Sequence, residues 1–461
     1  MAKVGVLSCV RVVNWWHACF LMTGAIYVGH AQAAPRPSAV YGPPAATPGI
    51  AAGPDLGVPL PGIPPGLHRA VAAAVFSHPQ VRAAEAQVKA SGYDIRSAKW
   101  SRFPSLSIEA MAITRGSANA SQDGTVLNVV VEQPIWAGGR TAALIDRAQA
   151  QMLVQRAGLD EVVRDLALRA TQAYFDVAQS ARRIDLFKDA LAQHSDLVET
   201  IGRRVDQQIS ARSDLDLAKA RAAQVEQQLA LALAQRSAGV NSLIELTGEA
   251  APDLGDVPRY DPALHHPATD QAVAAALACD PRIARLSAQS VVAHAEQRSA
   301  RAALFPQLVG QVSSNEILGQ RVGVALRAQT GNGLSQAAAA QGAAARALAS
   351  ENGISTAQRE VREAIRLDFL NNSAARERAG KSSAAAENSR AVIDSYKRQF
   401  IAGRRTWLDV MNALQESTNT RLAVLESETT AQLTMARIAL RTCSWEPRPR
   451  VDATEPHNGR N

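Results

Sequence analysis

Two short stretches decide the fold of this chain: RFPSLSIE at residues 102–109 and LFPQLVGQ at residues 304–311. Each places a Phe-Pro pair directly ahead of a segment in which apolar and polar residues partly alternate. Proline lacks a backbone donor and disfavours helical conformation in the residue before it, so the pair predicts the end of a helix. The alternation that follows predicts a strand. The repetition therefore predicts a helix-to-strand unit that occurs twice.

The repeat extends upstream of both Phe-Pro pairs. HPQV at residues 78–81 corresponds to DPRI at residues 280–283 at a shift of 202 residues, which is also the shift between the two Phe-Pro pairs. The segments between these motifs, residues 81–99 and 283–303, have helical patterns. Downstream, partly alternating segments with polar turns predict β-hairpins over residues 104–136 and 306–330, with the second shorter and weaker.

Long helices follow each predicted hairpin. No proline occurs between Pro134 and Pro252, or between Pro306 and Pro447, and both tracts are rich in alanine. The first tract carries a heptad seam in steps of four and three residues: Leu159, Val163, Leu166, Ala170, Ala173, Val177, Ser180, Ile184, Phe187, Leu191, His194, Val198, Ile201 and Val205. A helix over residues 141–208 would extend about 100 Å, which no compact domain contains.

Each long tract has one internal break. The first is QQISARSD at residues 207–214, after which helix is expected from residue 215. The second is FIAGRRTW at residues 400–407, where Gly403 suits a helix C-terminus and Thr406 the next N-cap. Each half is therefore predicted to hold a helical hairpin, over residues 140–247 and 334–443.

The predicted fold is mainly α with a small β part: two repeated long helical hairpins that build a tunnel, plus four strands that contribute to a barrel. The first repeat spans residues 67–250, a connector 251–270 and the second repeat 271–445, followed by a polar tail at 446–461. Residues 34–66 contain ten of the 22 prolines, so a disordered lead-in is expected there.

Residues 1–33 read as a secretory signal peptide. Basic residues precede an apolar run, Val12 to Val28, which is followed by Ala31-Gln32-Ala33, a small-x-small cleavage pattern. A transmembrane anchor is the alternative, but the run is short for a span of about 20 residues. Removal of the signal leaves Cys279 and Cys443, which could pair in an oxidising compartment or remain free.

Composition favours helices and argues against nucleic acid as a partner. The chain is 47% hydrophobic and only 4% aromatic, with alanine as the dominant apolar residue, which suits closely packed helices. Its net charge of +7 is spread at helix spacing and not gathered in a basic patch. We find no nucleophile constellation, phosphate-binding loop or metal-spaced cluster, so neither an enzyme nor a cofactor is expected. His265-His266 lacks further ligands nearby, which argues against a metal site.

Four strands are too few to seal a pore. An open sheet has two unpaired edges, which a membrane interior does not tolerate, so several copies of the chain must share one barrel. Their helices would then continue on one side of the membrane as a tube.

Several motifs together resemble the TolC family of outer-membrane channel proteins. They are the paired HPQV…FPSL and DPRI…FPQL, QPIWAGGR at residues 133–140 and YKRQFIAGRRTWLDVMNA at residues 396–413. The resemblance covers residues 67–445. It implies a homotrimer in the cell outer membrane, with a twelve-stranded barrel and a periplasmic helical tunnel. It also implies a periplasmic adaptor and an inner-membrane ABC transporter as partners.

The resemblance also implies a gate at the periplasmic tip. In the family an aromatic residue and an arginine hold the tip shut while acidic residues ring the pore; these positions match Phe400, Arg405 and Asp409. Asn412 stands at the second acidic position, and Asp216 at that of the acid facing Arg405. The residues that the resemblance places at the contact with the adaptor or pump are Ser210, Arg212, Ser213, Gly403, Arg404 and Thr406.

Alternatives remain for these residues and for the function. Arg405 and Asp409 could be an ordinary exposed pair, and Trp407 a packing residue of the helix turn. Overall likeness favours type I secretion of a protein toxin, such as an adenylate cyclase-haemolysin, over drug efflux. A periplasmic coiled-coil adaptor or scaffold is a different class of function, and it would lack the paired β-hairpins.

Overall fold

The computed structural model describes residues 62–113, 124–250, 260–264, 268–315, 319–328 and 333–447, all within one unit, Asp55–Asn461. The predicted signal peptide, most of the proline-rich lead-in, His265-His266 and most of the polar tail lie outside these residues.

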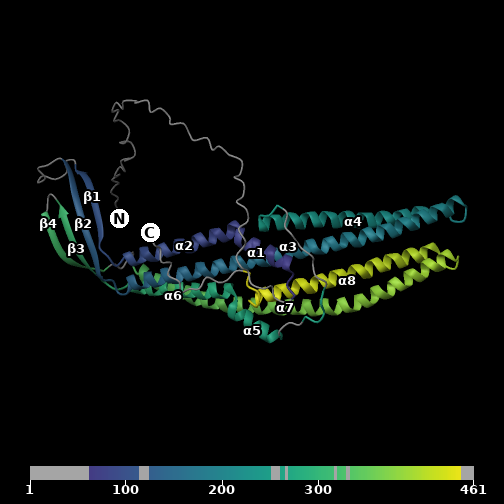
Figure 1. Cartoon of the computed structure of the whole chain (residues 1–461). Helices are drawn as coiled ribbons and strands as arrows, with labels where there is room; N and C mark the ends of the chain where they lie inside the picture. Colours follow the sequence, from purple (N-terminus) through teal and green to yellow (C-terminus); the bar gives the residue numbers. More distant parts are fainter. Residues whose placement is uncertain are drawn as a thin grey trace, which may run out of the picture. The chain divides into compact units, whose positions relative to one another are not determined.

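Helices and strands follow the order that the repeat predicts, with an additional short helix ahead of the first helix of each repeat (Figure 1). The first half contains α1 (Pro65–Ser77), α2 (Pro79–Trp100), β1 (Ser105–Ile113), β2 (Gly124–Trp136), α3 (Arg140–Asp206) and α4 (Arg212–Thr247). The second half contains α5 (Thr269–Cys279), α6 (Pro281–Ala302), β3 (Gln307–Asn315), β4 (Gly319–Arg327), α7 (Ser335–Ile401) and α8 (Trp407–Arg441). The predicted change from helix to strand at each Phe-Pro pair is confirmed.

The two repeats begin their paired helices in the same way. In α2 the His78 side chain caps the N-terminus by accepting from the backbone N–H of Gln80, with proline at the next position. In α6 the Asp280 carboxylate accepts from the N–H groups of Arg282 and Ile283, again ahead of proline. Proline suits the first helical position because the N–H it lacks would have no helical partner there.

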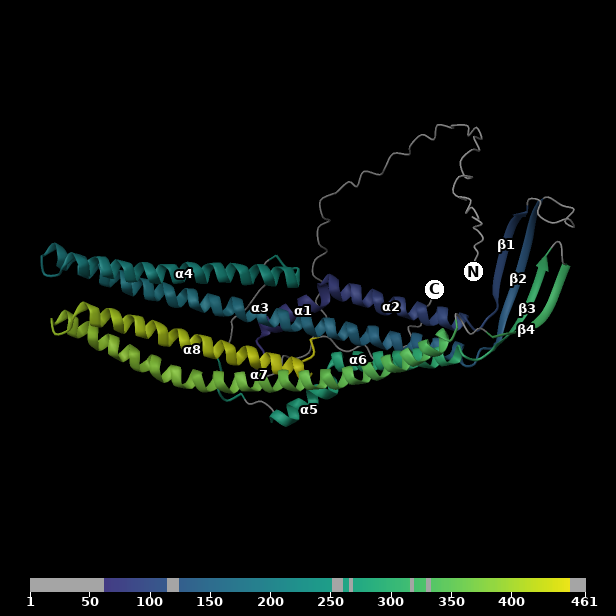
Figure 2. The same ribbon diagram turned by 180° about the vertical axis from the view of Figure 1, so that it is seen from behind.

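The long helices form two antiparallel hairpins whose turns lie at the end of the molecule opposite the sheet (Figures 1 and 2). Every residue of the predicted heptad seam of α3 is buried or half-buried, which confirms the seam. Gly239 of α4 allows close approach to α3, because a Cβ atom there would lie 2.9 Å from Val177 Cγ2. Helix α4 begins at Arg212, three residues before the predicted start, and Gln208 turns the chain with a φ of 61° in place of a glycine.

The strands form one antiparallel sheet in the order β1-β2-β3-β4. The expectation of shorter strands in the second hairpin is confirmed for β4, which has nine residues against thirteen in β2, and not for β3, which matches the nine residues of β1. Among the described strands, β1 and β4 each pair with only one neighbour, so both retain a free edge.

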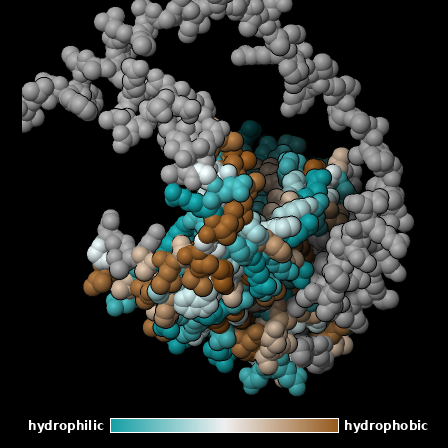
Figure 3. Space-filling view, turned by 90° about the vertical axis from the view of Figure 1, so that its left-hand side faces the viewer, coloured by the Kyte–Doolittle hydropathy of each residue, from teal (hydrophilic) through white to brown (hydrophobic). Residues whose placement is uncertain are grey.

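The register aligns apolar side chains across the sheet. Leu106 lies opposite Val131, which lies opposite Val312, which lies opposite Val322; Ile108 pairs with Val129 in the next row of the same face. Leu106, Ile108, Val322, Val324 and Leu326 are between 63% and 82% exposed. Figure 3 looks at the molecule from the sheet end and shows apolar residues gathered beside polar ones there. A face of this kind needs an apolar environment.

The opposite face of the sheet is polar. Glu132 of β2 and Arg327 of β4 reach across β3 and form an ion pair of 2.7 Å, with Arg327 also 3.5 Å from Gln311 Oε1. The sheet is therefore amphipathic, as in strands that separate lipid from a polar interior. None of the described helices is both long and apolar enough to cross a membrane.

Candidate functional site

The candidate site is the tip at which both helical hairpins turn. One apolar cluster there draws on all four long helices, and its buried members are Leu197, Ile201, Ala218, Ile393, Phe400, Val410, Met411, Ala413 and Leu414. This cluster therefore joins the α3–α4 hairpin to the α7–α8 hairpin at the tip. Residues at the turns protrude from a packed base.

Gly403 and Thr406 shape the turn between α7 and α8 as the sequence predicts. Gly403 has a φ of 72°, which L-residues with a side chain rarely adopt, and no atom lies within 4 Å of the position where a Cβ would stand. Thr406 is the N-cap of α8, and it exchanges hydrogen bonds with Asp409 in a capping box. The Thr406 N–H donates to Asp409 Oδ2 at 3.2 Å, and the Asp409 N–H donates to Thr406 Oγ1 at 3.3 Å.

Asp409 therefore has a structural role beside any role in a pore. The Thr406 hydroxyl, 2.9 Å from Asp409 Oδ2, is the main cause that lowers the pKa of the Asp409 carboxyl; the Thr406 N–H adds to it, and Arg405 contributes less. The Asp409 carboxylate stays charged to a lower pH than an ordinary aspartate. Asn412, one turn further along α8, is exposed.

Arg405 contacts three side chains around the same turn. Its guanidinium lies 3.8 Å from Asp409 Oδ2, donates to Gln399 Oε1 at 3.3 Å and stacks over Tyr396 at 4.3 Å from the ring centre. Within the described residues, Asp216 forms no ion pair with Arg405 and lies exposed on α4. Inside one chain, Arg405 and Asp409 thus form the ordinary exposed i,i+4 pair that the sequence leaves open as an alternative.

Phe400 lies in the packed base and not at the surface. It is 7% exposed, belongs to the apolar cluster, and carries the Arg204 guanidinium over its ring at 5.2 Å. Arg405 stacks on Tyr396, one turn earlier on α7, a contact that sequence reasoning missed. Tyr396 opens the motif YKRQF, but nothing in the spacing marks it, because α7 must end and α8 begin before Arg405 can fold back over it.

The residues expected to contact an adaptor or pump surround this turn and the turn between α3 and α4. Arg212, Ser213, Gly403, Arg404 and Thr406 are exposed, and Ser210 is half-buried. Trp407 packs against the apolar cluster, as its alternative role as a packing residue predicts. The tip is thus an arginine-bearing surface over an apolar base, and it also exposes Ile209 and Ile401, at 59% and 85%.

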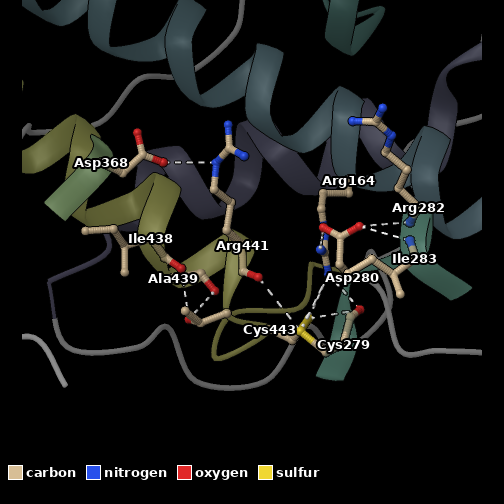
Figure 4. A network of polar contacts seen from close by, with 11 residues as sticks. Arg164, Cys279, Asp280, Arg282, Ile283, Asp368, Ile438, Ala439, Arg441 and Cys443 are labelled. Atoms are coloured by element: carbon tan, nitrogen blue, oxygen red, sulfur yellow. Dashed lines mark hydrogen bonds and ion pairs between the residues drawn. A yellow bond between two sulfur atoms is a disulfide. The ribbon is translucent and has the colours of Figure 1, made fainter. Parts of the chain in front are cut away.

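A second polar cluster lies where α5, α6 and the end of α8 meet (Figure 4). Cys279 and Cys443 form a disulfide across a sequence separation of 164 residues, which resolves the alternatives left open by the sequence. Beside it, Arg164 of α3 pairs with Asp280 Oδ2 at 3.0 Å. The disulfide therefore fastens the end of α8 to the corner between α5 and α6.

Asp368 of α7 is the most buried charge of this region, at 2% exposed side-chain area. It lies 3.1 Å from Arg437 Nη2 and 2.9 Å from Arg441 Nε, although the Arg441 N–H is not aligned for a hydrogen bond. Burial raises the pKa of the Asp368 carboxyl, and the two arginines oppose that rise without cancelling it. Within the described residues, no group of three or more potential ligands is arranged to hold a metal ion.

Comparison with known proteins agrees with this architecture. Residues 71–249 match the model of the family described as outer membrane efflux protein. A curated relative, the outer membrane efflux protein BepC of Brucella suis, is 28% identical over 219 residues, covering 45% of this chain and 46% of the relative. The matched part thus spans about half the length of that relative.

Solved channels share the fold at low sequence identity. The outer-membrane channel OprN superposes with a TM-score of 0.74 at 18% identity, covering 84% of this chain and 91% of OprN. The outer membrane protein VceC of Vibrio cholerae superposes with a TM-score of 0.71 at 17% identity, covering 82% of this chain and 95% of VceC. Residues 71–249 are therefore similar to the outer membrane efflux protein family, and the chain as a whole shares the fold of solved outer-membrane channels.

Proposed function

We propose that three copies of this chain form one outer-membrane channel that passively conducts cargo from the periplasmic side to the outside. The amphipathic sheet supports this proposal most directly. Its apolar face suits lipid, its polar face suits a water-filled interior, and its two free edges can pair with those of further copies. Three sheets of four strands would give a closed barrel of twelve.

The helical hairpins would then continue the barrel as a periplasmic tunnel. Their turns would lie farthest from the membrane, where a periplasmic adaptor and an inner-membrane ABC transporter could engage the exposed tip. A periplasmic adaptor or scaffold is disfavoured as the function of this chain, because it would have no use for a sheet with an exposed apolar face.

The test is the assembly state and conductance of the purified full-length protein. We expect it in the outer-membrane fraction, extracted only by detergent, with cross-linking that stops at a trimer. In planar bilayers we expect discrete conductance steps. A protein that stays monomeric and dissolved without detergent would contradict the proposal.

We propose that the tip is the gate. In the trimer, three Asp409 carboxylates would ring the narrow end of the tunnel, while Arg405 would hold α7 and α8 in the closed arrangement. The contacts of Arg405 with Tyr396 and Gln399 support this role, because both residues lie on α7 and both contacts would be lost if α7 and α8 separated at the turn. Asn412 would leave the channel with one acidic ring where Asp would give two. Asp216 would meet Arg405 only across a boundary between subunits.

For the cargo, we propose type I secretion of a protein toxin, on the strength of the overall sequence resemblance. Small-molecule efflux is the second candidate, because the relative BepC is described as an efflux protein. A deletion strain assayed for toxin release, haemolysis and drug sensitivity separates the two. Lost toxin release with unchanged drug sensitivity supports secretion, and the reverse result supports efflux.

A further inference from the structure

The junctions between helices and strands carry aromatic side chains that are left largely exposed. Trp100 is 67% exposed, Phe103 56%, Trp136 50% and Phe305 55%. Trp100 contacts Phe103 with 4.9 Å between ring centres, and Trp136 contacts Phe305 edge-on at 6.5 Å. All four therefore lie in one zone at the helix-facing end of the sheet.

The strand register places Trp136 on the apolar face. Trp136 lies opposite Leu308, and Leu308 lies opposite Leu326, which is 69% exposed. A groove of about 250 Å³ lies beside Trp136, and it is lined by Arg102, Pro134, Ile135, Trp136, Ala137, Gly139, Thr141 and Ala142. The groove therefore sits where the apolar face of the sheet ends and the polar helices begin.

The same junctions carry exposed cations, and the neighbouring carboxylates Glu132 and Asp146 are paired with Arg327 and Arg298. Lys99, Arg102, Arg140 and Arg301 are exposed, and among the described residues none of these four side chains is in an ion pair. Residues 95–108, 133–145 and 297–315 contain no Asp or Glu. The nearby Arg298 and Arg327 differ, since each is paired with a carboxylate. The zone is therefore complementary in charge to an anion.

We propose that Lys99, Arg102 and Arg140, with Trp136 and its groove, bind the headgroups of anionic phospholipids in the periplasmic leaflet of the outer membrane. The apolar sheet face selects lipid over a soluble anion, because acyl chains can cover that face while a phosphate meets the cations beside it. Aromatic rings of this kind suit the level of the headgroups. The inference rests on the proposed function, which puts this end of the sheet at the periplasmic surface.

The test compares lipid affinities of the full-length trimer in detergent by native mass spectrometry. We expect phosphatidylglycerol to bind more tightly than phosphatidylcholine. The triple variant Lys99→Gln/Arg102→Gln/Arg140→Gln should lower the affinity for phosphatidylglycerol by about 100-fold, since each cation near an anionic surface contributes about five-fold. Its affinity for phosphatidylcholine should stay unchanged.

A matched control removes three exposed cations elsewhere: Arg82→Gln/Lys89→Gln/Arg346→Gln. Lys89 lies on α2 about 15 Å from Lys99 along the helix axis. We expect this variant to bind phosphatidylglycerol as the wild type does. Equal losses of phosphatidylglycerol affinity in both triple variants would mean a general charge effect and would overturn the proposal. Unchanged phosphatidylglycerol binding by Lys99→Gln/Arg102→Gln/Arg140→Gln would overturn it as well.

Two further measurements distinguish lipid binding from binding of a free anion and from loss of the channel itself. Sodium phosphate should displace phosphatidylglycerol no better than sodium chloride of equal ionic strength, and displacement by phosphate alone would overturn the choice of lipid. Conductance in bilayers of phosphatidylcholine tests the channel independently. Conducting trimers without any preference for phosphatidylglycerol would reject the lipid site and leave the proposed function standing, whereas an absence of channels would reject the proposed function itself.

Discussion

The guanidinium carbon of Arg405 lies 4.3 Å from the ring centre of Tyr396, so the residue after the turn at the tip folds back onto the helix before it. A cation–π contact at an exposed site contributes about 0.5–1 kcal/mol. Arg405 also contacts Gln399 and Asp409, which lie on α7 and α8 respectively. The turn is therefore fastened by one side chain with three partners.

Arg405→Ala should favour the open tip and raise the single-channel conductance. Loss of the contact with Tyr396 alone would shift the closed-to-open ratio by about two- to five-fold per subunit. Arg404→Ala is the matched control, because Arg404 is also exposed and bonds through its backbone N–H to the Gln399 carbonyl. Bilayer recordings at one salt concentration compare the two. Identical conductance in both variants would mean that Arg405 does not hold the tip closed.

Asn412→Asp should add a second acidic ring and increase cation preference. Asp409→Asn should reduce it, while an amide oxygen still accepts from the Thr406 N–H and keeps the helix cap. The reversal potential in a salt gradient measures both changes. Opposite shifts in the two variants are the expected signature of residues that face the pore, and two unshifted potentials would place both side chains outside it.

The cation preference should also persist into acid. Hydrogen bonds from Thr406 lower the pKa of Asp409, so its charge is present above its usual pKa and is lost only as the pH falls through the lowered value. Thr406→Val removes the hydroxyl that contributes most, and it should move the loss of selectivity to higher pH. Reversal potentials measured from neutral pH down to about pH 3 test this; coincident curves would contradict it.

Removal of the Cys279–Cys443 disulfide should destabilise the protein without changing its channel. A disulfide across 164 residues restricts the unfolded chain strongly, and losing such a bond typically costs about 2–5 kcal/mol. We expect Cys279→Ala/Cys443→Ala to lower the apparent melting temperature of the helical circular dichroism signal. Reductant should lower the melting temperature of the wild type and leave that of the variant alone. Equal sensitivity of both would show that the bond is not formed.

Asp368 should make stability depend on pH in the unusual direction for a carboxylate. Its pKa is raised in the folded protein, so its contribution to stability is full below the unfolded value and is lost as the pH rises through the folded value. Asp368→Asn should reduce the fall in melting temperature above about pH 4. Asp165→Asn is the control, since Asp165 is 62% exposed. A pH profile unchanged by Asp368→Asn would contradict the raised pKa.

Local signals in the sequence determined the elements of this protein. Each Phe-Pro pair ends a helix and starts a strand, the heptad seam of α3 is buried or half-buried along its length, and Gly403 and Thr406 form the expected turn. These features follow from the backbone restrictions of proline and glycine and from residue spacing within one helix. They need no knowledge of the neighbours.

Only the tertiary structure decided which side chains meet. The contact of Arg405 with Tyr396, the burial of Asp368 between α7 and α8, and the pairing of Cys279 with Cys443 join residues from different elements. The strand register that aligns Leu106 with Val322 across the whole sheet is of the same kind. Such contacts depend on the rotation of each helix about its axis and on the register of each strand. Many weak packing interactions together set the rotation and the register.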